Sequence, residues 1–158
     1  MLLIASAQDP GSRFGGSDLP EPERRKAFNW LSAFHADPSR QMVWDQTFRI
    51  YDEYRNKLTD QDYGLLVVHE KMTSARQVDI AFDADGHAVV SGQFASLDPS
   101  DRKFLATVLG DEGRSRLVNA SDTDWLQQEG SLTAAGVAVE HILEDWLRAK
   151  HAEKESRK

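Results

Sequence analysis

Two acidic clusters lie close together in the second half of the sequence. Asp98 and Asp101 stand at the start of an expected helix, and Asp122 and Asp124 come just after an expected strand. In an open α/β sheet, the carboxyl ends of the strands and the adjoining helix starts face one crevice, so the clusters are expected to converge. Carboxylates gathered without basic partners repel each other, and a divalent cation relieves that repulsion. The pattern therefore indicates a Mg²⁺ or Mn²⁺ site and chemistry on phosphate.

Each of these acids also has an ordinary structural role open to it. Asp101 and Asp122 suit helix caps or first helical turns, where carboxylates are common. Glu53 lies within another expected helix, four residues before Lys57, a spacing that allows a surface ion pair. In a chain with 26 acidic residues, chance groupings are easy to find. The metal-site hypothesis therefore depends on the local patterns taken together.

Composition narrows the class of protein. The 158-residue chain has the size of one domain, and the absence of cysteine excludes disulfides and thiolate zinc sites. The net charge of -7 argues against a module that holds nucleic acid by charge alone. It argues less against a nuclease, whose carboxylates bind metal first. No apolar run is long enough to span a membrane, and the short apolar start lacks a signal peptide's basic lead, so a cytoplasmic location is expected.

Short apolar segments alternate with amphipathic ones along the chain. We expect strands at 1–7, 42–44, 77–82, 115–119 and 137–141, a hairpin arm at 87–91, and helices at 21–35, 46–58, 60–72, 98–109, 124–134 and from 142. Asp45 is the expected cap of the second helix, and Gly136 the C-cap before the last strand. This alternation predicts an α/β fold, a three-layer α/β/α arrangement with a mostly parallel central sheet. One domain is expected over residues 1–147, followed by a charged tail at 148–158 that frays.

Three segments resemble the PIN-domain ribonucleases. Residues 43–58 read as a strand and then a helix that carries a glutamate, Glu53. Residues 98–106 read as a small-residue helix with an aspartate, Asp101, at its start. Residues 117–125 read as a strand, a polar residue and two aspartates before an aromatic residue. The likeness extends over most of the chain.

This resemblance implies a metal-dependent endoribonuclease, often the toxin of a toxin–antitoxin pair. It implies that Glu53, Asp101 and Asp122 bind Mg²⁺ or Mn²⁺, with Asp124 as a fourth acid in the hydrolysis of RNA. Four basic residues near these acids in the sequence are expected to contact the RNA backbone, although exposed basic residues often serve only solubility: Arg49, Arg55, Arg102 and Lys103. The implied partners are RNA, a basic antitoxin segment that masks the acidic site, and a second copy of the chain in a homodimer.

The first strand departs from the family pattern. The family places an aspartate directly before the first apolar run, and here Met1 stands where that motif would end. The first strand is therefore expected to be truncated. Either the true start codon lies upstream, or the protein is a catalytically degenerate relative.

Two other classes of function stay open beside the enzyme. The first is a PIN-like module that binds RNA or an antitoxin without cutting, which the missing aspartate would favour. The second is phosphoryl transfer, because receiver and phosphatase domains also gather aspartates at strand ends. Such domains need an aspartate nucleophile after a strand, and the first strand offers none.

Because one metal ligand is missing, we predict that the chain beginning at Met1 has weak nuclease activity or none. The test compares Mn²⁺-dependent RNA cleavage by this chain and by one extended upstream. Equal, robust cleavage by both would contradict the prediction.

Overall fold

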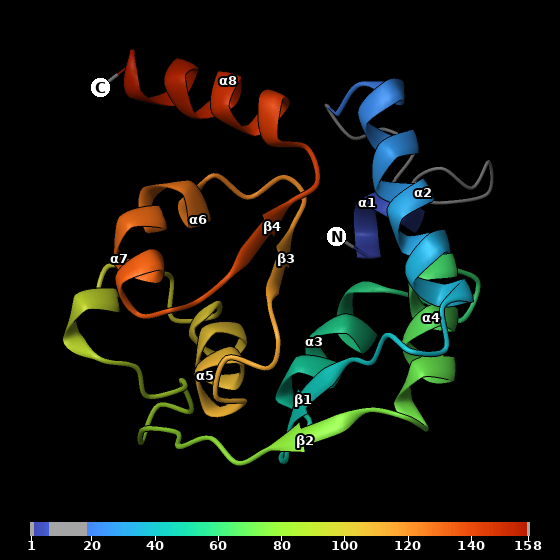
Figure 1. Cartoon of the computed structure of the whole chain (residues 1–158), viewed down its shortest axis with the longest axis horizontal. Helices are drawn as coiled ribbons and strands as arrows, with labels where there is room; N and C mark the ends of the chain where they lie inside the picture. Colours follow the sequence, from blue (N-terminus) through green and yellow to red (C-terminus); the bar gives the residue numbers. More distant parts are fainter. Residues whose placement is uncertain (1, 7–18, 158) are drawn as a thin grey trace.

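A computed structural model describes residues 2–6 and 19–157 of the chain, and within these ranges helices alternate with short strands (Figure 1). The strands are β1 (Val43–Asp45), β2 (Arg76–Val78), β3 (Leu117–Asn119) and β4 (Val139–His141). The α-helices are α1 (Leu2–Ser6), α2 (Glu21–Ala36), α3 (Arg49–Lys57), α4 (Tyr63–Met72), α5 (Arg102–Gly110), α6 (Asp124–Gln127), α7 (Glu129–Ala134) and α8 (Glu144–Glu155). None of the described helices combines the length and the apolar character needed to cross a bilayer.

The strands form two parallel pairs. Trp44 of β1 lies opposite Gln77 of β2, and Val118 of β3 lies opposite Glu140 of β4. Helices connect the two strands of each pair, as parallel pairing requires. The expected mixed α/β class and the parallel pairing are confirmed. Within the described residues the two pairs are separate sheets, so one continuous central sheet is not seen there.

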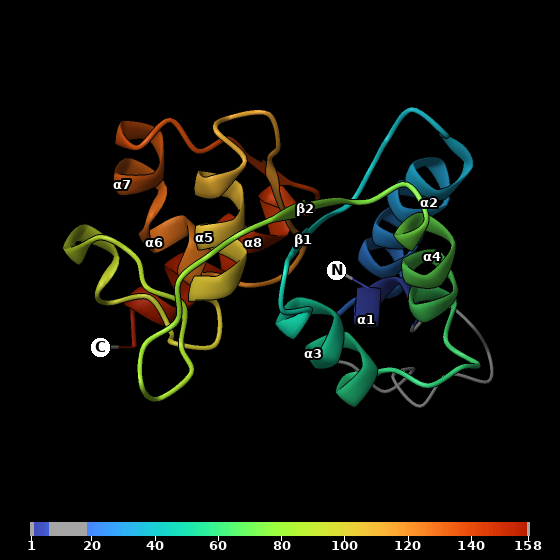
Figure 2. The ribbon, with the colours of Figure 1, turned by 90° about the horizontal axis from the view of Figure 1, so that it is seen from below.

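The described residues form two larger hydrophobic cores and a smaller third one made of Leu19, Ala120 and Leu143. Figure 2 shows α2 and α4 on one side of β1, with α5 to α8 on the other. Leu31, Trp44 and Leu65 belong to the first core, and Leu105 and Leu132 belong to the second. Phe104 of α5 packs against both of these larger cores. Helix α5 also contacts both β1 and β3, so it connects the two halves of the molecule.

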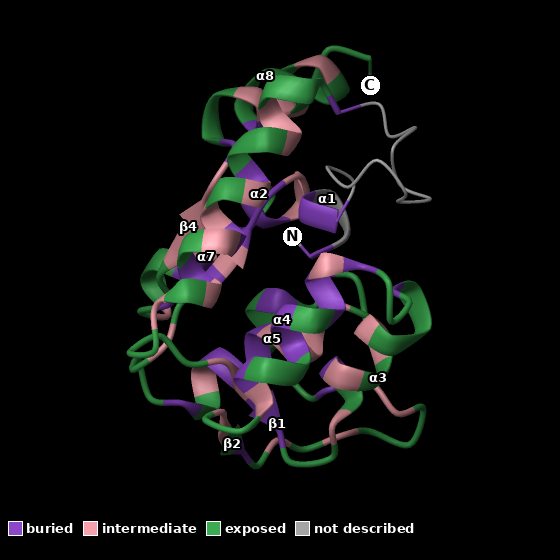
Figure 3. Ribbon diagram, turned by 90° about the vertical axis from the view of Figure 1, so that its right-hand side faces the viewer, coloured by how far each residue is buried: buried purple, intermediate pink, exposed green. Residues whose placement is uncertain are grey.

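The N-terminal segment is helical where a strand was expected. Leu2 and Ala5 are buried on one face of α1 (Figure 3). The Ser6 hydroxyl donates to the Leu2 carbonyl at 2.9 Å and accepts the Gly64 N–H at 2.8 Å. A Cβ at Gly64 would lie 2.7 Å from the Leu2 carbonyl oxygen, so glycine permits this close approach of α1 to α4. Periodicity cannot separate helix from strand in so short an apolar run.

Several other expected boundaries differ from the structure. The strand expected at 77–82 and its hairpin arm at 87–91 reduce to β2 and one antiparallel bridge between Phe82 and Ala88. The helix expected at 124–134 is divided into α6 and α7 at Gln128, and α5 begins later than its expected start. Most of the loop expected at 9–20 lies outside the described residues.

The expected C-terminal fraying is wrong for most of the charged tail. Helix α8 continues through Glu155. Ion pairs one helical turn apart support it: Arg148 pairs with Glu144 at 2.9 Å, and Lys150 pairs with Glu153 at 3.0 Å. Gly136, with a φ of 73°, follows α7 as the expected C-cap glycine.

A buried carboxylate joins β1 to α3. Asp45 is 0% exposed, and its side chain accepts the backbone N–H groups of Arg49 and Ile50, both at 2.9 Å. It also accepts the Thr47 hydroxyl at 2.6 Å. These are first-turn amides of α3. The expectation that Asp45 is the N-cap residue is wrong, because α3 begins later and Phe48, with a φ of 59°, holds that position. The Asp45 carboxylate nevertheless accepts the first-turn amides from three residues further upstream. The same bonds fix the direction in which α3 leaves the sheet.

Replacing Asp45 is therefore expected to destabilise the fold. Asp45→Ala leaves buried N–H groups without acceptors and should lower the free energy of unfolding by about 2–4 kcal/mol. Urea denaturation monitored by tryptophan fluorescence measures the change. Asp52→Ala, at an exposed position of the same helix, is the control and should cost about 0.5 kcal/mol. An equal decrease in the free energy of unfolding for both variants would show that the hydrogen bonds of Asp45 do not stabilise the fold.

Candidate acidic site in the inter-sheet cleft

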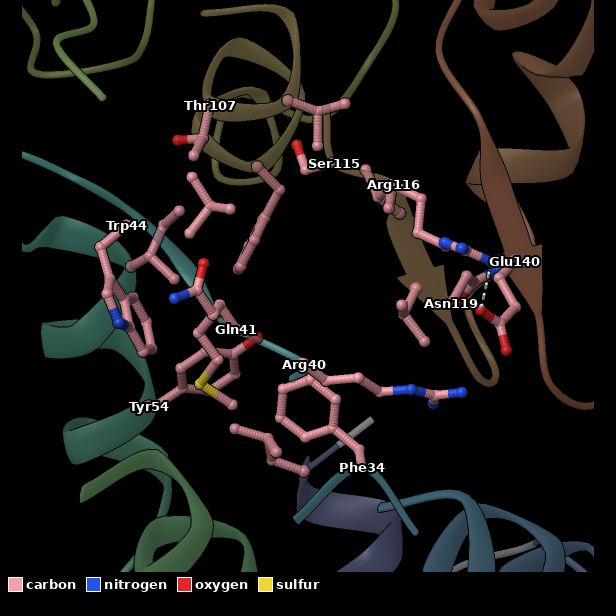
Figure 4. Close-up of a pocket in the computed structure, with 18 of the residues that line it drawn as sticks. Phe34, Arg40, Gln41, Trp44, Tyr54, Thr107, Ser115, Arg116, Asn119 and Glu140 are labelled. Atoms are coloured by element: carbon pink, nitrogen blue, oxygen red, sulfur yellow. Dashed lines mark hydrogen bonds and ion pairs between the residues drawn. The ribbon is translucent and has the colours of Figure 1, made fainter. Parts of the chain in front are cut away.

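A cavity of about 590 Å³, here called the inter-sheet cleft, lies between the two strand pairs. Figure 4 shows Trp44 and Tyr54 on one wall, with Arg116 and Asn119 on the other. The two halves also touch at this cavity, where Trp30 Nε1 of α2 donates to the Glu140 carboxylate of β4 at 2.6 Å. The cleft is thus built by segments far apart in the sequence.

Three of the four acids predicted for the site line this cleft. Glu53 comes from α3, Asp101 stands directly before α5, and Asp122 lies in the turn after β3. Asp124 does not line the cleft. Its carboxylate instead receives Lys154 of α8 at 3.1 Å.

The surroundings of Asp101 disfavour the charged form of its carboxylate. Burial raises its pKa to about 6, with further contributions from the charges of Asp122, Asp98 and Glu53. The nearby Lys103 ammonium acts in the opposite direction without cancelling the effect. The acids from the three segments are therefore close enough to influence each other's ionisation.

Glu53 differs from Asp101 because lysines neutralise it. Lys103 Nζ lies 2.5 Å from one Glu53 oxygen, and Lys57 Nζ lies 2.6 Å from the other. Burial alone would raise the pKa of Glu53, but the hydrogen bonds and charges of the two lysines outweigh burial and lower it. The expectation of acids without basic partners is therefore wrong for Glu53. The i,i+4 pair with Lys57, considered as an ordinary role for Glu53, is also present.

The three acids do not form a ready-made coordination sphere. In the described part of the chain, one group of three possible metal ligands (His, Cys, Asp or Glu) has all its ligand atoms within 4.8 Å of one another. It consists of Asp83, Asp85 and His87. That group is mostly exposed, on the turn after β2, and Asp83 already accepts the backbone N–H groups of Asp85 and His87. To share one cation, the acids of the cleft must draw closer, and Glu53 must release Lys103.

Asn119 is a buried residue that the site prediction missed. Its side chain, 4% exposed, donates to the Asp122 carbonyl at 2.8 Å and accepts the Asp122 N–H at 3.1 Å. Its amide also donates to His141 Nδ1 at 3.1 Å, and burial lowers the pKa of that histidine. The Asp122 carboxylate accepts the N–H of Asp124, the first residue of α6, at 2.9 Å. A polar residue closing an apolar strand was the available sequence signal for Asn119.

The predicted RNA-contacting residues separate into two groups. Arg49 and Lys103 line a second cavity of about 350 Å³, which shares Glu53 and Lys57 with the inter-sheet cleft. Phe82 also lines this second cavity, and the Arg49 guanidinium lies over its ring, 4.7 Å from the ring centre. Arg102 lines neither cavity and donates to the Leu97 and Ala95 carbonyls. Arg55 is exposed and also lines neither cavity.

Comparisons of the chain with known protein families, with curated proteins and with solved structures found no match.

The raised pKa of Asp101 predicts a pH-dependent cost to stability. The folded protein holds this proton more tightly than the unfolded chain, whose aspartate titrates near 3.8. Ionisation therefore destabilises the fold as pH rises from about 4 to 6, and the penalty is constant above that range. Removing the charge with Asp101→Asn should stabilise the protein at pH 7 by about 1–2 kcal/mol, after allowance for partial solvent screening.

The measurement is urea denaturation of both proteins between pH 4 and pH 7.5. Asp98→Asn is the control, because hydrogen bonds from Ser100 lower the pKa of Asp98, and it should give no gain. A difference between Asp101→Asn and wild type that stays constant across the range would contradict the assignment.

Proposed function

We propose that the protein is a metal-dependent endoribonuclease of the PIN type, with Glu53, Asp101 and Asp122 as the acidic ligands. The observation that carries this proposal is the meeting of these three carboxylates, from separate segments, around one cleft. Burial, with added repulsion from the neighbouring acids, raises the Asp101 pKa to about 6, and a divalent cation would favour the charged form of this carboxylate. The mixed α/β class and the parallel strand pairing are features that a PIN-like three-layer fold would share, and the proposal includes that fold although the described strands form two separate sheets.

The chemistry of the donors fits Mg²⁺ or Mn²⁺. Both ions accept carboxylate oxygens, and Mg²⁺ keeps several waters, so a few carboxylates suffice. When bound, such an ion supplies Lewis-acid stabilisation of a phosphate and a lowered pKa for water. The buried amide of Asn119 holds the turn that carries Asp122, and so positions that carboxylate.

Basic side chains beside the acids can hold the RNA backbone. Lys103 pairs with Glu53 in the structure and would turn to a phosphate once a cation neutralises that carboxylate. Arg49 lies in the adjoining cavity, where a neighbouring phosphate could follow the groove. In this arrangement Lys103 would pair with Glu53 when no cation is bound and with an RNA phosphate when a cation is bound.

A second candidate is a binding module that does not cut. The observation that favours it is the pairing of Glu53 with Lys103 and Lys57, which already supplies positive charge to part of the acidic site. In this candidate the cleft binds RNA or an antitoxin segment, and no cation enters. The toxin role, a basic antitoxin partner and a homodimer belong to the proposal through the family resemblance. A cytoplasmic location belongs to it as an expectation from the sequence alone.

Metal titration separates the two candidates even if catalytic turnover is weak. Isothermal titration of Mn²⁺ should show at least about tenfold weaker binding for Asp101→Asn and for Asp122→Asn. Lys103→Gln removes the competing ammonium and should bind Mn²⁺ several-fold more tightly than wild type. All proteins carry Asp83→Asn and His87→Gln, so that the exposed group cannot contribute.

Asp124→Asn is the matched control, because this acid lies close in sequence but pairs with Lys154 outside the cleft. Its Mn²⁺ affinity should stay within about twofold of wild type. An RNA-cleavage assay with the same variants then tests whether bound metal supports hydrolysis. Binding of RNA without any Mn²⁺ binding, and with no gain from Lys103→Gln, would favour the non-cutting module.

A further inference from the structure

We propose that the inter-sheet cleft binds an extended peptide segment of a partner protein, which adds as a strand between β1 and β3. The partner segment is apolar in its middle, with an acidic residue at its first end and a basic residue at its last. This inference rests on the second candidate function above, a partner segment in the cleft, and specifies how that segment binds. It does not depend on the nuclease proposal, because strand edges and hydrogen-bond donors need no metal.

Both walls of the cleft present the edge of a parallel strand. In the β1–β2 pair, Arg76 N–H donates to the Met42 carbonyl, so the backbone groups of Val43 face away from β2. In the β3–β4 pair, Leu117 N–H donates to the Ala138 carbonyl, so those of Val118 face away from β4. Val43 and Val118 both line the cleft, and in the described residues no strand pairs with either edge. An added strand would give these groups partners, as in β-augmentation.

Buried donors at the cleft lack acceptors. Trp44 and Thr107 each have 2% of their surface exposed, and in the structure Trp44 Nε1 and Thr107 Oγ1 have no hydrogen-bond partner. The buried Nε atom of Arg76 also has none, and all three residues line the cleft. Tryptophan and arginine nitrogens are donors only, and a buried donor without an acceptor costs free energy. These atoms are buried, so a ligand would reach them only after the walls of the cleft shift. The carbonyl groups of a peptide backbone are acceptors that would then satisfy them.

Charge is distributed unevenly along the cleft. Arginines stand at the amino ends of the strands, with Arg40 before β1 and Arg116 directly before β3. The carboxylates of Asp101 and Asp122 stand toward the carboxyl ends of the strands. Arg40 and Arg116 already pair with Asp37 and Glu140, but such exposed pairs are weak and can exchange partners. A segment running parallel to β1 and β3 would thus meet positive charge first and negative charge last.

The dimensions suit a short segment. Each flanking strand has three residues, and a strand rises about 3.3 Å per residue. About six residues would therefore cover the strands and reach the charges at both ends. Apolar side chains of the segment would lie against Phe34 and Phe104, which line the cleft. The parallel direction follows from the neighbours, since both existing pairs are parallel.

The experiment uses the full chain and synthetic peptides. The probe is the capped hexapeptide Glu-Val-Ile-Thr-Val-Lys, tested beside the same peptide with its two charges exchanged and beside one N-methylated on every residue. Hydrogen exchange followed by NMR should show at least tenfold slower exchange at the Val43 and Val118 amides with the first peptide only. The methylated peptide keeps every side chain, but its methyl groups remove the backbone donors and block close approach along both edges, so it should protect neither amide.

Protein variants test the charge assignment. Arg40→Glu combined with Arg116→Glu should weaken binding of the probe at least fivefold. Arg25→Glu is the matched control, because Arg25 has the same 65% side-chain exposure as Arg116 and is also ion-paired, but does not line the cleft. Thermal unfolding confirms that each variant is folded before binding is measured.

Three results would overturn the proposal. The first is equal binding of the N-methylated peptide, which would show that strand pairing is not involved. The second is tighter binding of the charge-exchanged peptide. The third is protection of the same two amides by a single-stranded RNA oligonucleotide or by self-association without peptide, which would assign the cleft to another occupant. Failure of Mn²⁺ binding would leave this inference standing, since no peptide contact passes through a cation.

Discussion

The packing of α5 against both strand pairs is the constraint on which the rest of the structure depends. Phe104 packs against both of the larger hydrophobic cores, and α5 contacts β1 as well as β3. This packing places the first turn of α5 between the other two acidic segments. Asp101 therefore faces Asp122, while Lys103, two residues later, reaches Glu53. A change that loosened Phe104 would disperse the acidic site as well as divide the core.

Glu53 and Asp101 lie in different electrostatic environments within the cleft. Glu53 has lysine partners and a lowered pKa, whereas Asp101 has acidic neighbours and a raised one. Lys103 influences both groups, so its position decides how much negative charge the site presents. A divalent cation and the Lys103 ammonium would compete for the same carboxylates, which links the proposed metal site to the proposed contact with RNA.

The two proposals place two different ligands, a divalent cation and a partner peptide, in the same inter-sheet cleft. Its carboxylates suit a cation, while its open strand edges and unpaired buried donors suit a peptide backbone. The two occupants would meet only near Asp101 and Asp122, at one end. A bound partner segment could thus cover the acidic site sterically, through contacts that are mostly made elsewhere. The cleft is therefore suited both to the proposed chemistry and to its control by a partner.

The sequence by itself determined the fold class and the local interactions of this protein. Long-range packing decided which distant side chains meet. Alternating periodicity predicted the α/β class, and the type of Asp45 predicted that it would interact with the start of the next helix, because these depend on neighbours within a few residues. The position of the N-cap was predicted three residues too early, since Phe48 holds it. The pairing of Glu53 with Lys103, the contact of Asp124 with Lys154 and the helical state of α1 were not predictable in this way. Each depends on partners 30 or more residues distant, such as Gly64 for α1. Only the tertiary structure brings such groups together, because no local pattern encodes which distant side chain will neutralise a given charge.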